Sequence, residues 1–574
     1  MTHHRLPRMI FSILAILVIG FFPGCLKKTP ADLVLTNGKI MTVEETAPEV
    51  GALAVSGDRI VAVGTAKKIK RYIGSSTRVI DLKGRTAVPG FIDSHAHFTG
   101  VGEARMILDL TKARNWDEIV ALVAAAAGRA KPGEWIRGRG WHQEKWDRRP
   151  EPNVDGLPFH DSLSHVTPDN PVLLEHASGH SCLANAKAME LGGVTRETAD
   201  PAGGEIVRDA QGNPIGAFRE VAQGLIGRPL YGSELKKTEA ERAAQERKAI
   251  ELAAQECLSK GITSVHDAGA SFGTIDLYRS LAEQGRLGVR IYAMIDEGNS
   301  GLKQRIAQYR IIGAGQNHLT VRAIKRLLDG ALGAHGAWLL EPYSDLPSST
   351  GLSTTPIAEL KETAQLAMEN GFQLCTHAIG DRANREILDI YEQAFAAHPE
   401  KQDVRWRVEH AQHLSPSDIP RFGRLGVIAA MQGVHCTSDG PWVIAKLGEK
   451  RAREGAYAWR SIMDGGAVIC NGTDSPVEDV DPIPSFYSTV TRMMKNGTAF
   501  FPEQRLTRKE ALGTYTLNGA YAAFQEELLG SLKPGKLADI TVLSKDIMTV
   551  PEQEIPTTAV LMTIVGGWVL YEKN

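Results

Sequence analysis

Two histidines that follow an apolar run are the residues of this sequence best suited to chemistry. The segment Ala87-Val-Pro-Gly-Phe-Ile-Asp-Ser-His-Ala-His97 contains a predicted buried strand, Val88–Asp93, with His95 and His97 just past its end. Because side chains alternate along a strand, both imidazoles point in the same direction. Two neutral imidazoles can hold a divalent metal ion. A His-x-His pair also arises by chance in 574 residues, so the metal hypothesis needs further ligands downstream.

Candidates for those ligands are found in four later segments that read as apolar strands, at or near the end of each: Lys325, His377, His410 and Asp474. A lysine in a strand that is buried on both faces is disfavoured unless it is neutralised or paired, so Lys325 is itself a candidate for chemistry. If the segments are parallel strands of one barrel, all of these side chains lie at the C-terminal rim, where barrel active sites form.

The middle of the chain alternates short apolar strands with amphipathic helices. Eight core strands are predicted: Val88–Asp93, Thr263–His266, Arg290–Met294, Val321–Leu327, Phe372–Thr376, Trp406–Glu409, Val427–Met431 and Val468–Asn471. The helices between or after them include Glu239–Ser259, Ile357–Asn370, Arg382–Ala397 and Leu506–Tyr515. Eight strand–helix units predict a (β/α)8 TIM barrel, here over residues 87–529.

Two other regions are added to this barrel. Residues 100–245 are too long for one strand–helix connection and contain a strand of their own, Pro171–His176, which indicates an insertion or lid after barrel strand 1. Residues 32–86 and 530–574 both consist of short β segments separated by glycine turns. The two chain ends are therefore predicted to pair into one small β-sandwich domain.

The first 25 residues read as an export signal. A short polar start precedes the apolar run Met9–Phe22, which is too short for a comfortable membrane-spanning helix. The run ends in Phe22-Pro-Gly-Cys25, which resembles a bacterial lipobox with Cys25 as the lipidated residue, although Phe22 and Pro23 are unusual there. The expected location is the bacterial cell envelope, with a lipid anchor in a membrane. Ordinary cleaved export and an uncleaved anchor are the alternatives.

Composition limits the partners of the protein. The sequence is 43% hydrophobic and 23% charged, with a formal net charge of -2, as in an ordinary soluble enzyme. It lacks the clustered lysines and arginines of a nucleic-acid-binding protein. The five cysteines after Cys25 are widely spaced without a Cys-x-x-Cys motif, so we expect buried free thiols rather than a zinc ribbon or a disulfide framework.

The ordered set of motifs resembles the amidohydrolase superfamily of metal-dependent barrel hydrolases, in particular amidohydrolase family 3, the YtcJ-like branch. The motifs are Pro89-Gly-Phe-Ile-Asp-Ser-His-Ala-His97, Gly261-Ile-Thr-Ser-Val-His-Asp-Ala-Gly269, Ile324-Lys-Arg-Leu-Leu-Asp-Gly330, His377-Ala-Ile-Gly-Asp-Arg-Ala383, Glu409-His-Ala-Gln412, Gly472-Thr-Asp-Ser-Pro476 and Gly535-Lys-Leu-Ala-Asp-Ile540. The resemblance runs from about residue 32 to the C-terminus.

The resemblance implies a metal centre. Its ligands would be His95, His97 and Asp474 for one ion and His377 and His410 for a second, with carboxylated Lys325 as the bridge. Paired metal ions activate a water and polarise a substrate carbonyl. Asp474 would act as the proton shuttle. Mixed nitrogen and oxygen ligation suits zinc, while iron, manganese and nickel are compatible, and the same residues could hold a single ion.

The resemblance also suggests residues that contact the substrate, namely His180, Glu220 and Asp329. His266, His335, His413 and His435 are expected to be structural, and the segment Trp141–Trp146 could line the mouth or pack the insertion against the barrel. The chain departs from the branch at Arg326, which should point outward and needs a partner, and at Thr473 and Ser475 beside Asp474.

The resulting hypothesis is an exported, metal-dependent amidohydrolase that cleaves a C–N bond, of an amide or formamide type, in a small molecule. Metal-activated hydroxide would be the nucleophile. Two alternatives remain open at this point: a single-metal deaminase or isomerase on the same scaffold, and a non-catalytic surface protein that keeps the barrel for binding. Six intact ligand positions favour an enzyme over a binding protein.

Overall fold

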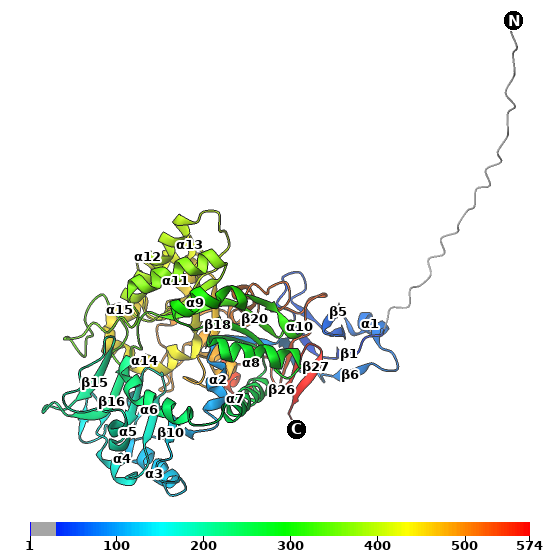
Figure 1. The fold of residues 1–574 in the computed structure, drawn as a ribbon. Helices are drawn as coiled ribbons and strands as arrows, with labels where there is room; N and C mark the ends of the chain where they lie inside the picture. The colour runs from blue at the N-terminus through cyan, green and yellow to red at the C-terminus, as the bar shows by residue number, and fades with distance from the viewer. Residues whose placement is uncertain (2–29, 574) are drawn as a thin grey trace.

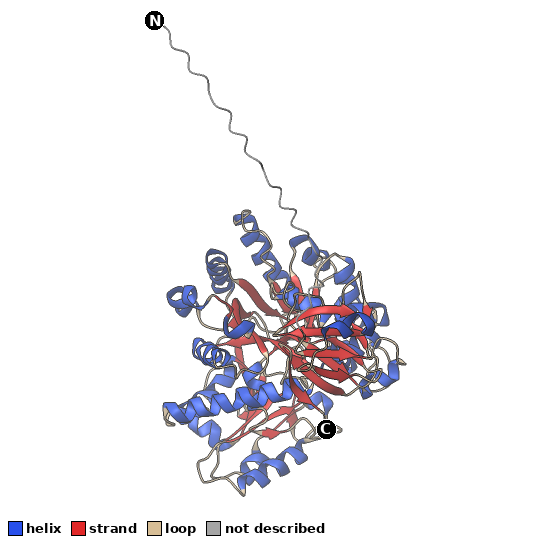
Figure 2. Ribbon diagram, turned by 90° about the vertical axis from the view of Figure 1, so that its right-hand side faces the viewer, coloured by secondary structure: helices blue, strands red, loops and turns tan. Residues whose placement is uncertain are grey.

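The computed structural model describes Met1 and residues 30–573. The predicted signal segment 1–25, with Cys25, therefore lies outside the described residues, apart from Met1. Within the described part, the centre of the molecule is a ring of strands with helices on its outer side (Figure 2). No helix among the described residues is long and apolar enough to cross a membrane.

Eight parallel strands form a nearly closed barrel, which confirms the predicted fold class. They follow one another in chain order as β8 (Phe91–Ala96), β17 (Ile262–Ala270), β18 (Arg290–Ile295), β20 (Leu319–Leu327), β21 (Gln373–Ala378), β22 (Arg407–His410), β23 (Ile428–Gln432) and β24 (Ile469–Gly472). The backbone of Asp474 donates to the carbonyl of His95 at 2.7 Å, and His97 donates to Ser475 at 2.8 Å. These two bonds connect the end of β24 to β8 and bring the last strand beside the first.

Helices cover the outside of this barrel and fill the connections. They include α7 (Glu239–Ser259), α8 (Phe272–Glu283), α11 (Ile357–Asn370), α12 (Asp381–Ala397), α14 (Gly433–Leu447), α17 (Pro482–Thr491) and the shorter α18 (Arg508–Thr514). The start of α7 is set by Thr238, whose side chain forms a capping box with Glu241. The helix predicted at Leu506–Tyr515 is shorter because Thr507 caps it, again with a reciprocal glutamate, Glu510.

The first predicted barrel strand, Val88–Asp93, is wrong in its boundaries. Thr86–Pro89 is a separate strand, β7, which pairs with β25 (Ile540–Leu543) outside the barrel, and the barrel strand starts only at Phe91. The chain switches sheets at Gly90, where a Cβ atom would lie 2.2 Å from Oγ1 of Thr263. His95 is consequently inside β8 rather than past its end, and His97 is the first residue after it.

The chain ends form the predicted β-sandwich. One sheet has the order β5-β4-β1-β6, from Arg59–Gly64, Ala52–Ser56, Leu33–Thr36 and Arg78–Asp81. The other has the order β27-β26-β25-β7-β2-β3, and its remaining strands are Trp568–Glu572, Val560–Val565, Lys39–Met41 and Glu49–Val50. Buried Leu, Ile and Val side chains from both sheets make one core between them.

A buried ion pair joins this sandwich to the barrel. Arg290, the first residue of β18, donates from Nε and Nη2 to both carboxylate oxygens of Asp539, at 2.7 and 2.9 Å. Asp539 directly precedes β25 and also accepts from the backbone of Gly566. The pair therefore fixes the sandwich against the N-terminal ends of the barrel strands, away from the C-terminal rim.

The insertion between β8 and β17 has its own six-stranded sheet, in the order β15-β16-β14-β13-β10-β9. Its strands are Gly204–Arg208, Pro214–Glu220, Ser181–Ala184, Val172–His176, Ile136–Trp141 and Leu108–Asp109, and helices α3 (Trp116–Ala127), α4 (Asp161–Val166), α5 (Ala186–Leu191) and α6 (Gly224–Glu234) accompany them. The insertion and the terminal sheets lie at opposite ends of the molecule (Figure 1).

Candidate metal centre and active-site cavity

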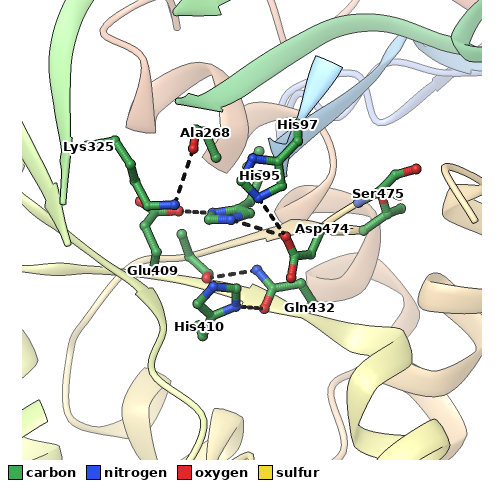
Figure 3. Close-up of polar contacts among 12 residues, drawn as sticks. His95, His97, Ala268, Lys325, Glu409, His410, Gln432, Asp474 and Ser475 are labelled. Atoms are coloured by element: carbon green, nitrogen blue, oxygen red, sulfur yellow. Dashed lines mark hydrogen bonds and ion pairs between the residues drawn. The ribbon is translucent and has the colours of Figure 1, made fainter. Parts of the chain in front are cut away.

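Three of the predicted ligands meet where β8 and β24 end. Nε2 of His95 lies 3.4 Å from Oδ1 of Asp474, and Nε2 of His97 lies 3.3 Å from the same oxygen. Figure 3 shows these three side chains pointing toward one another. Asp474 has a positive φ of 55°, which is uncommon for a residue with a Cβ. The turn that follows β24 therefore holds the backbone of Asp474 in an unusual conformation.

His410 and His377 complete the group. The ring of His410 lies 4.7 Å from that of His95 and 4.5 Å from that of His377, measured between ring centres. One potential ligand atom from each of His95, His410 and Asp474 lies within 4.8 Å of the other two. Residues from β8, β21, β22 and the end of β24 therefore converge on one point.

The unpaired atoms at this point fit a metal ion. Nε2 of His95, Nε2 of His377 and Oδ1 of Asp474 are buried and form no hydrogen bond to any described residue. The nearest polar atoms are 3.3–3.4 Å away, in Asp474 for His95, in Asp329 for His377 and in His97 for Asp474, and none forms a hydrogen bond. A buried polar atom without a hydrogen bond is costly, and a divalent cation could satisfy these atoms. Imidazole nitrogens with a carboxylate oxygen are a donor set that zinc accepts.

Two neighbouring side chains hold the histidines in the form that binds metal. Glu409 accepts a hydrogen bond from Nδ1 of His95, and Oε1 of Gln432 accepts from Nδ1 of His410 at 2.7 Å. With Nδ1 as the donor, the neutral form of each ring keeps its lone pair on Nε2, the nitrogen that faces the cluster. The sequence interpretation gave Glu409 and Gln432 no role, because their partners come from other strands.

The surroundings set the charges of several groups in the cluster. Burial holds the pKa values of His377 and His410 well below the ordinary range, so both imidazoles are neutral at pH 7. Burial alone would raise the pKa of Asp474, but its contacts with His95 and His97 lower the pKa by a larger amount. The carboxylate is therefore ionised. Glu409 is also ionised, because buried Arg407 and His95 lower its pKa more than burial raises it.

Lys325 lies in β20 with its amine turned toward the cluster (Figure 3). The side chain is buried, with 2% of its surface exposed, and its Nζ donates to the carbonyl of Ala268 at 3.2 Å. No carboxylate among the described residues lies within ion-pair distance of this amine. The charge on Lys325 is close enough to lower the pKa values of His377 and His410.

Comparison with known proteins now places the chain. A model of the amidohydrolase family matches residues 78–571. The chain is 31% identical to the putative amidohydrolase YtcJ of Bacillus subtilis (strain 168), over 94% of this chain and 99% of that protein. This protein belongs to the amidohydrolase family.

Two further similarities are informative. The chain is 27% identical to an N-substituted formamide deformylase of Arthrobacter pascens, over 95% of this chain and 99% of that enzyme. It superposes with a TM-score of 0.71 on the crystal structure of an uncharacterized metal-dependent hydrolase from Pyrococcus horikoshii OT3, at 27% identity, covering 91% of this chain and 99% of that one. The predicted YtcJ-like relationship is confirmed, and the chain is a metal-dependent hydrolase of this family.

A cavity lies over the cluster of this amidohydrolase. His377, His410 and Asp474 form its floor, and residues of the insertion and of the connections after the barrel strands form its walls. The wall residues include His142, Lys145, His176, His180, Leu332, His435, Trp442 and Glu478. The insertion therefore shapes the part of the cavity that a substrate would fill. In the predicted Trp141–Trp146 segment, Trp141 is fully buried and packs the insertion, while His142 and Lys145 line the cavity.

The three residues that we expected to contact the substrate divide into two groups. His180 lines the cavity, and its ring centre lies 5.0 Å from that of His377. Glu220 lies behind it and accepts from Nδ1 of His180 at 2.8 Å, so it orients His180 rather than facing the cavity. Asp329 is fully buried and accepts from the backbone of Trp338, Ile379 and Gly380, which fixes the two connections beside His377.

The departures from the family pattern are accommodated locally. Arg326 points outward as predicted and donates to Oγ1 of Thr363, to Oδ1 of Asn299 and to the carbonyl of Glu297, which satisfies its guanidinium. The hydroxyl of Thr473 donates to Asp93 at 2.5 Å, so this threonine helps to join β24 to β8.

His435, which we expected to have a structural role, lies at the wall of the active-site cavity. His435, in the first turn of α14, lines the cavity beside His410, with 11° between the ring planes. The sequence offers a weak signal for it, because His435 follows strand β23 as the metal-site residues follow theirs.

Proposed function

We propose that this amidohydrolase cleaves the C–N bond of a small amide or N-substituted formamide. The observation that carries the proposal is the convergence of His95, His410 and Asp474 beneath the active-site cavity. The similarity to an N-substituted formamide deformylase across nearly the whole chain supports this substrate class. One or two divalent ions, zinc by donor set, would polarise the carbonyl and acidify a water in this site.

Asp474 is the proposed proton shuttle. Its carboxylate is ionised, faces the cavity, and lies next to the metal-ligating nitrogens of His95 and His97. It would accept a proton from the attacking water as the new C–O bond forms. It would then return that proton to the nitrogen as the C–N bond breaks, so that a neutral amine leaves.

Lys325 is the proposed carboxylated ligand. Its amine is buried and has only a backbone carbonyl as a partner, which is an unstable situation for a charged ammonium group. Attack of the neutral amine on CO2 would form an N–C bond and release one proton, leaving an anionic carbamate among the metal ligands. In 13C-bicarbonate the holoenzyme should show a carbamate NMR signal that Lys325→Met lacks. The same spectrum for both proteins would refute this assignment.

Hydrolysis itself can be tested on the holoenzyme. We expect the metal-replete protein to release amine and carboxylate, or formate, from members of a panel of N-substituted formamides and small amides. Asp474→Asn should abolish turnover. Release of ammonia from an aminated ring, or isomerisation without net hydrolysis, would favour the deaminase or isomerase alternative. A metal-replete protein that turns over no member of the panel, and no aminated ring, would contradict the proposal.

The cell-envelope location also enters as a proposal. Only four residues separate Cys25 from Pro30, so a lipid on Cys25 would lie at most about 18 Å from the described chain. The backbone N–H of Ala31 donates a hydrogen bond to the carbonyl of Tyr72, shortly after helix α1 (Ala66–Ile69). This region exposes four basic side chains: Lys67, Lys68, Lys70 and Arg71. Such a surface suits anionic headgroups.

The anchor has a direct test. Cells that express the full chain should incorporate labelled palmitate into it and retain it in the membrane fraction, and Cys25→Ser should lose both properties. Retention of label by the serine variant would contradict the lipid anchor.

A further inference from the structure

His435 has one ring nitrogen in use and one that is not. Its side chain is almost entirely buried, with 5% of the residue exposed, yet it lines the active-site cavity. Nδ1 lies 3.0 Å from the amide nitrogen of Gln412. Nε2 is buried and has no hydrogen-bond partner among the described residues. Because a buried polar atom without a partner is costly, an unused nitrogen at a cavity wall points to a ligand.

The hydrogen bond to Gln412 determines what Nε2 can do. The amide N–H of Gln412 donates, so Nδ1 of His435 must accept, and the proton of the neutral ring resides on Nε2. His410 has the reverse arrangement, because its Nδ1 donates to Gln432 and its Nε2 keeps the lone pair. The two rings are nearly parallel, with centres 6.4 Å apart. One ring therefore presents a metal-binding lone pair, and its neighbour presents an N–H donor.

An unpartnered histidine alone would carry little weight. His413 is also buried with both ring nitrogens unpaired, but it does not line the cavity. His142 does line the cavity, and its Nδ1 accepts from the backbone N–H of Glu144, so it too has an Nε2 proton. The ring contacts of His142, however, are with His176 and Trp442 and not with a metal ligand. His435, in contrast, combines an unpaired N–H donor with a position beside His410.

We propose that Nε2–H of His435 donates a hydrogen bond to the carbonyl oxygen of the bound amide, and that Gln412 positions it by fixing the tautomer. This proposal rests on the proposed C–N hydrolysis. As the water oxygen bonds to the carbonyl carbon, the π electron pair of the carbonyl moves to its oxygen, and the His435 proton faces the growing negative charge. When the C–N bond breaks, the pair returns to restore the carbonyl. His435 keeps its proton throughout and is a catalytic residue, whereas Gln412 is a positioning residue.

The decisive variants are His435→Phe, which keeps a ring but removes the donor, and His435→Gln, which keeps an N–H donor. For His435→Phe we expect kcat to fall by about 10²–10³, as after the loss of a single oxyanion donor, with KM and bound metal close to the wild-type values. His435→Gln should recover at least about tenfold of that loss. Gln412→Leu should lower kcat by a smaller factor, about tenfold, because the ring can then adopt either tautomer.

His142→Phe is the matched control, since it removes an equivalent donor from the same cavity at a distance from the metal ligands. It should change KM more than kcat. A second readout does not depend on turnover: a phosphonamidate that mimics the tetrahedral geometry should bind His435→Phe about 10²-fold more weakly, while an unreactive substrate analogue binds both proteins equally.

The outcomes separate the two levels of the proposal. Wild-type protein that hydrolyses no amide refutes the proposed function. Active wild-type protein together with His435→Phe of unchanged kcat, or with equal losses in His435→Phe and His142→Phe, refutes the role of His435. Loss of metal from both His435→Phe and His435→Gln would show that His435 has a structural role, and it would also overturn the proposed role as a donor.

Discussion

Replacement of Glu409 by glutamine should weaken metal binding without changing any metal ligand. The Glu409 carboxylate is fully buried and accepts from Nδ1 of His95 on one side. On the other side it pairs with Arg407, which donates from Nη2 at 2.9 Å and approaches with Nε at 2.7 Å. Glutamine keeps the shape but removes the negative charge that makes His95 a more basic ligand.

The expected size of the effect follows from these two sets of contacts. Loss of a carboxylate behind a ligating histidine costs about 10–100-fold in metal affinity, which corresponds to about 1.4–2.7 kcal/mol. Arg407 also loses its counter-charge, and breaking a buried ion pair costs about 3–5 kcal/mol of folding stability. Arg407 retains bonds to the carbonyl of Ser94 and to Nδ1 of His266, so we expect the lower end of that range.

Two measurements distinguish these effects. Competition with a chromophoric chelator gives the metal dissociation constant of the folded protein, and urea unfolding of the metal-free protein gives its stability. Asp539→Asn is the matched control, because it breaks the equally buried pair with Arg290 at the opposite end of the barrel. The control should lose about 3–5 kcal/mol of stability and keep the wild-type metal affinity.

The reasoning would be refuted by either of two results. Glu409→Gln could bind metal as tightly as the wild type, which would mean that His95 does not depend on the carboxylate. Alternatively, Asp539→Asn could weaken metal binding as much as Glu409→Gln does, which would mean that general destabilisation, rather than the state of one imidazole, controls affinity.

Three further outcomes are expected. Removal of metal with a chelator should lower the thermal unfolding midpoint, because a ligand at 100 times its Kd adds about 2.7 kcal/mol to the free energy of unfolding. Added zinc should restore the midpoint. An unchanged midpoint would argue against a metal in this site. Gly472→Ala should destabilise the protein by about 1–3 kcal/mol in urea unfolding and reduce bound metal, since its Cβ would lie 2.5 Å from the backbone nitrogen of His95; wild-type stability and metal content would contradict this steric argument. Bonds from Arg460 and Thr507 lower the pKa of Glu510 from 4.5 to about 2, so this carboxylate stabilises the fold above pH 4.5 and that contribution disappears as the pH falls toward 2. Because both ion-pair partners are partly exposed, we expect Glu510 to contribute about 1–2 kcal/mol to the free energy of unfolding. Glu510→Gln should remove this part of the pH dependence of stability in urea titrations. An identical pH profile for the variant would exclude Glu510 as its source.

The barrel could be predicted from sequence because its strands are short, apolar and separated by amphipathic helices. The helix Ile357–Asn370 has the predicted bounds, since its buried residues repeat at helical spacing and Gly371 ends it in a left-handed conformation. The sheet switch at Gly90 was missed because the apolar pattern continues through it. The side chain of Thr263 leaves no room for a Cβ at this position, and its approach depends on the assembled barrel.

The candidate ligands could be predicted for a related reason, and their supporting residues could not. His95, His410 and Asp474 stand at the ends of recognisable strands, so the barrel alone brings them together. Glu409 is adjacent to His410 in sequence, yet it serves His95, because neighbouring residues of a strand face opposite or oblique directions. The role of Gln432 likewise depends on which strand lies beside β22.

The polar interior of the barrel is best explained by the demands of the metal centre. Arg407 and Glu409 are both fully buried, and apolar side chains of similar size would often give equal or greater stability. The pair persists where its carboxylate contacts His95 and where its guanidinium reaches the backbone beside that histidine, at Ser94. An apolar replacement could fill the same volume, but it could not accept the Nδ1 proton of His95. A neutral amide, such as Gln432 provides for His410, could accept that proton but would lack the negative charge that makes the ring a more basic ligand. The charge of this pair therefore determines the state of a ligand, and its contribution should be largest in metal affinity rather than in stability.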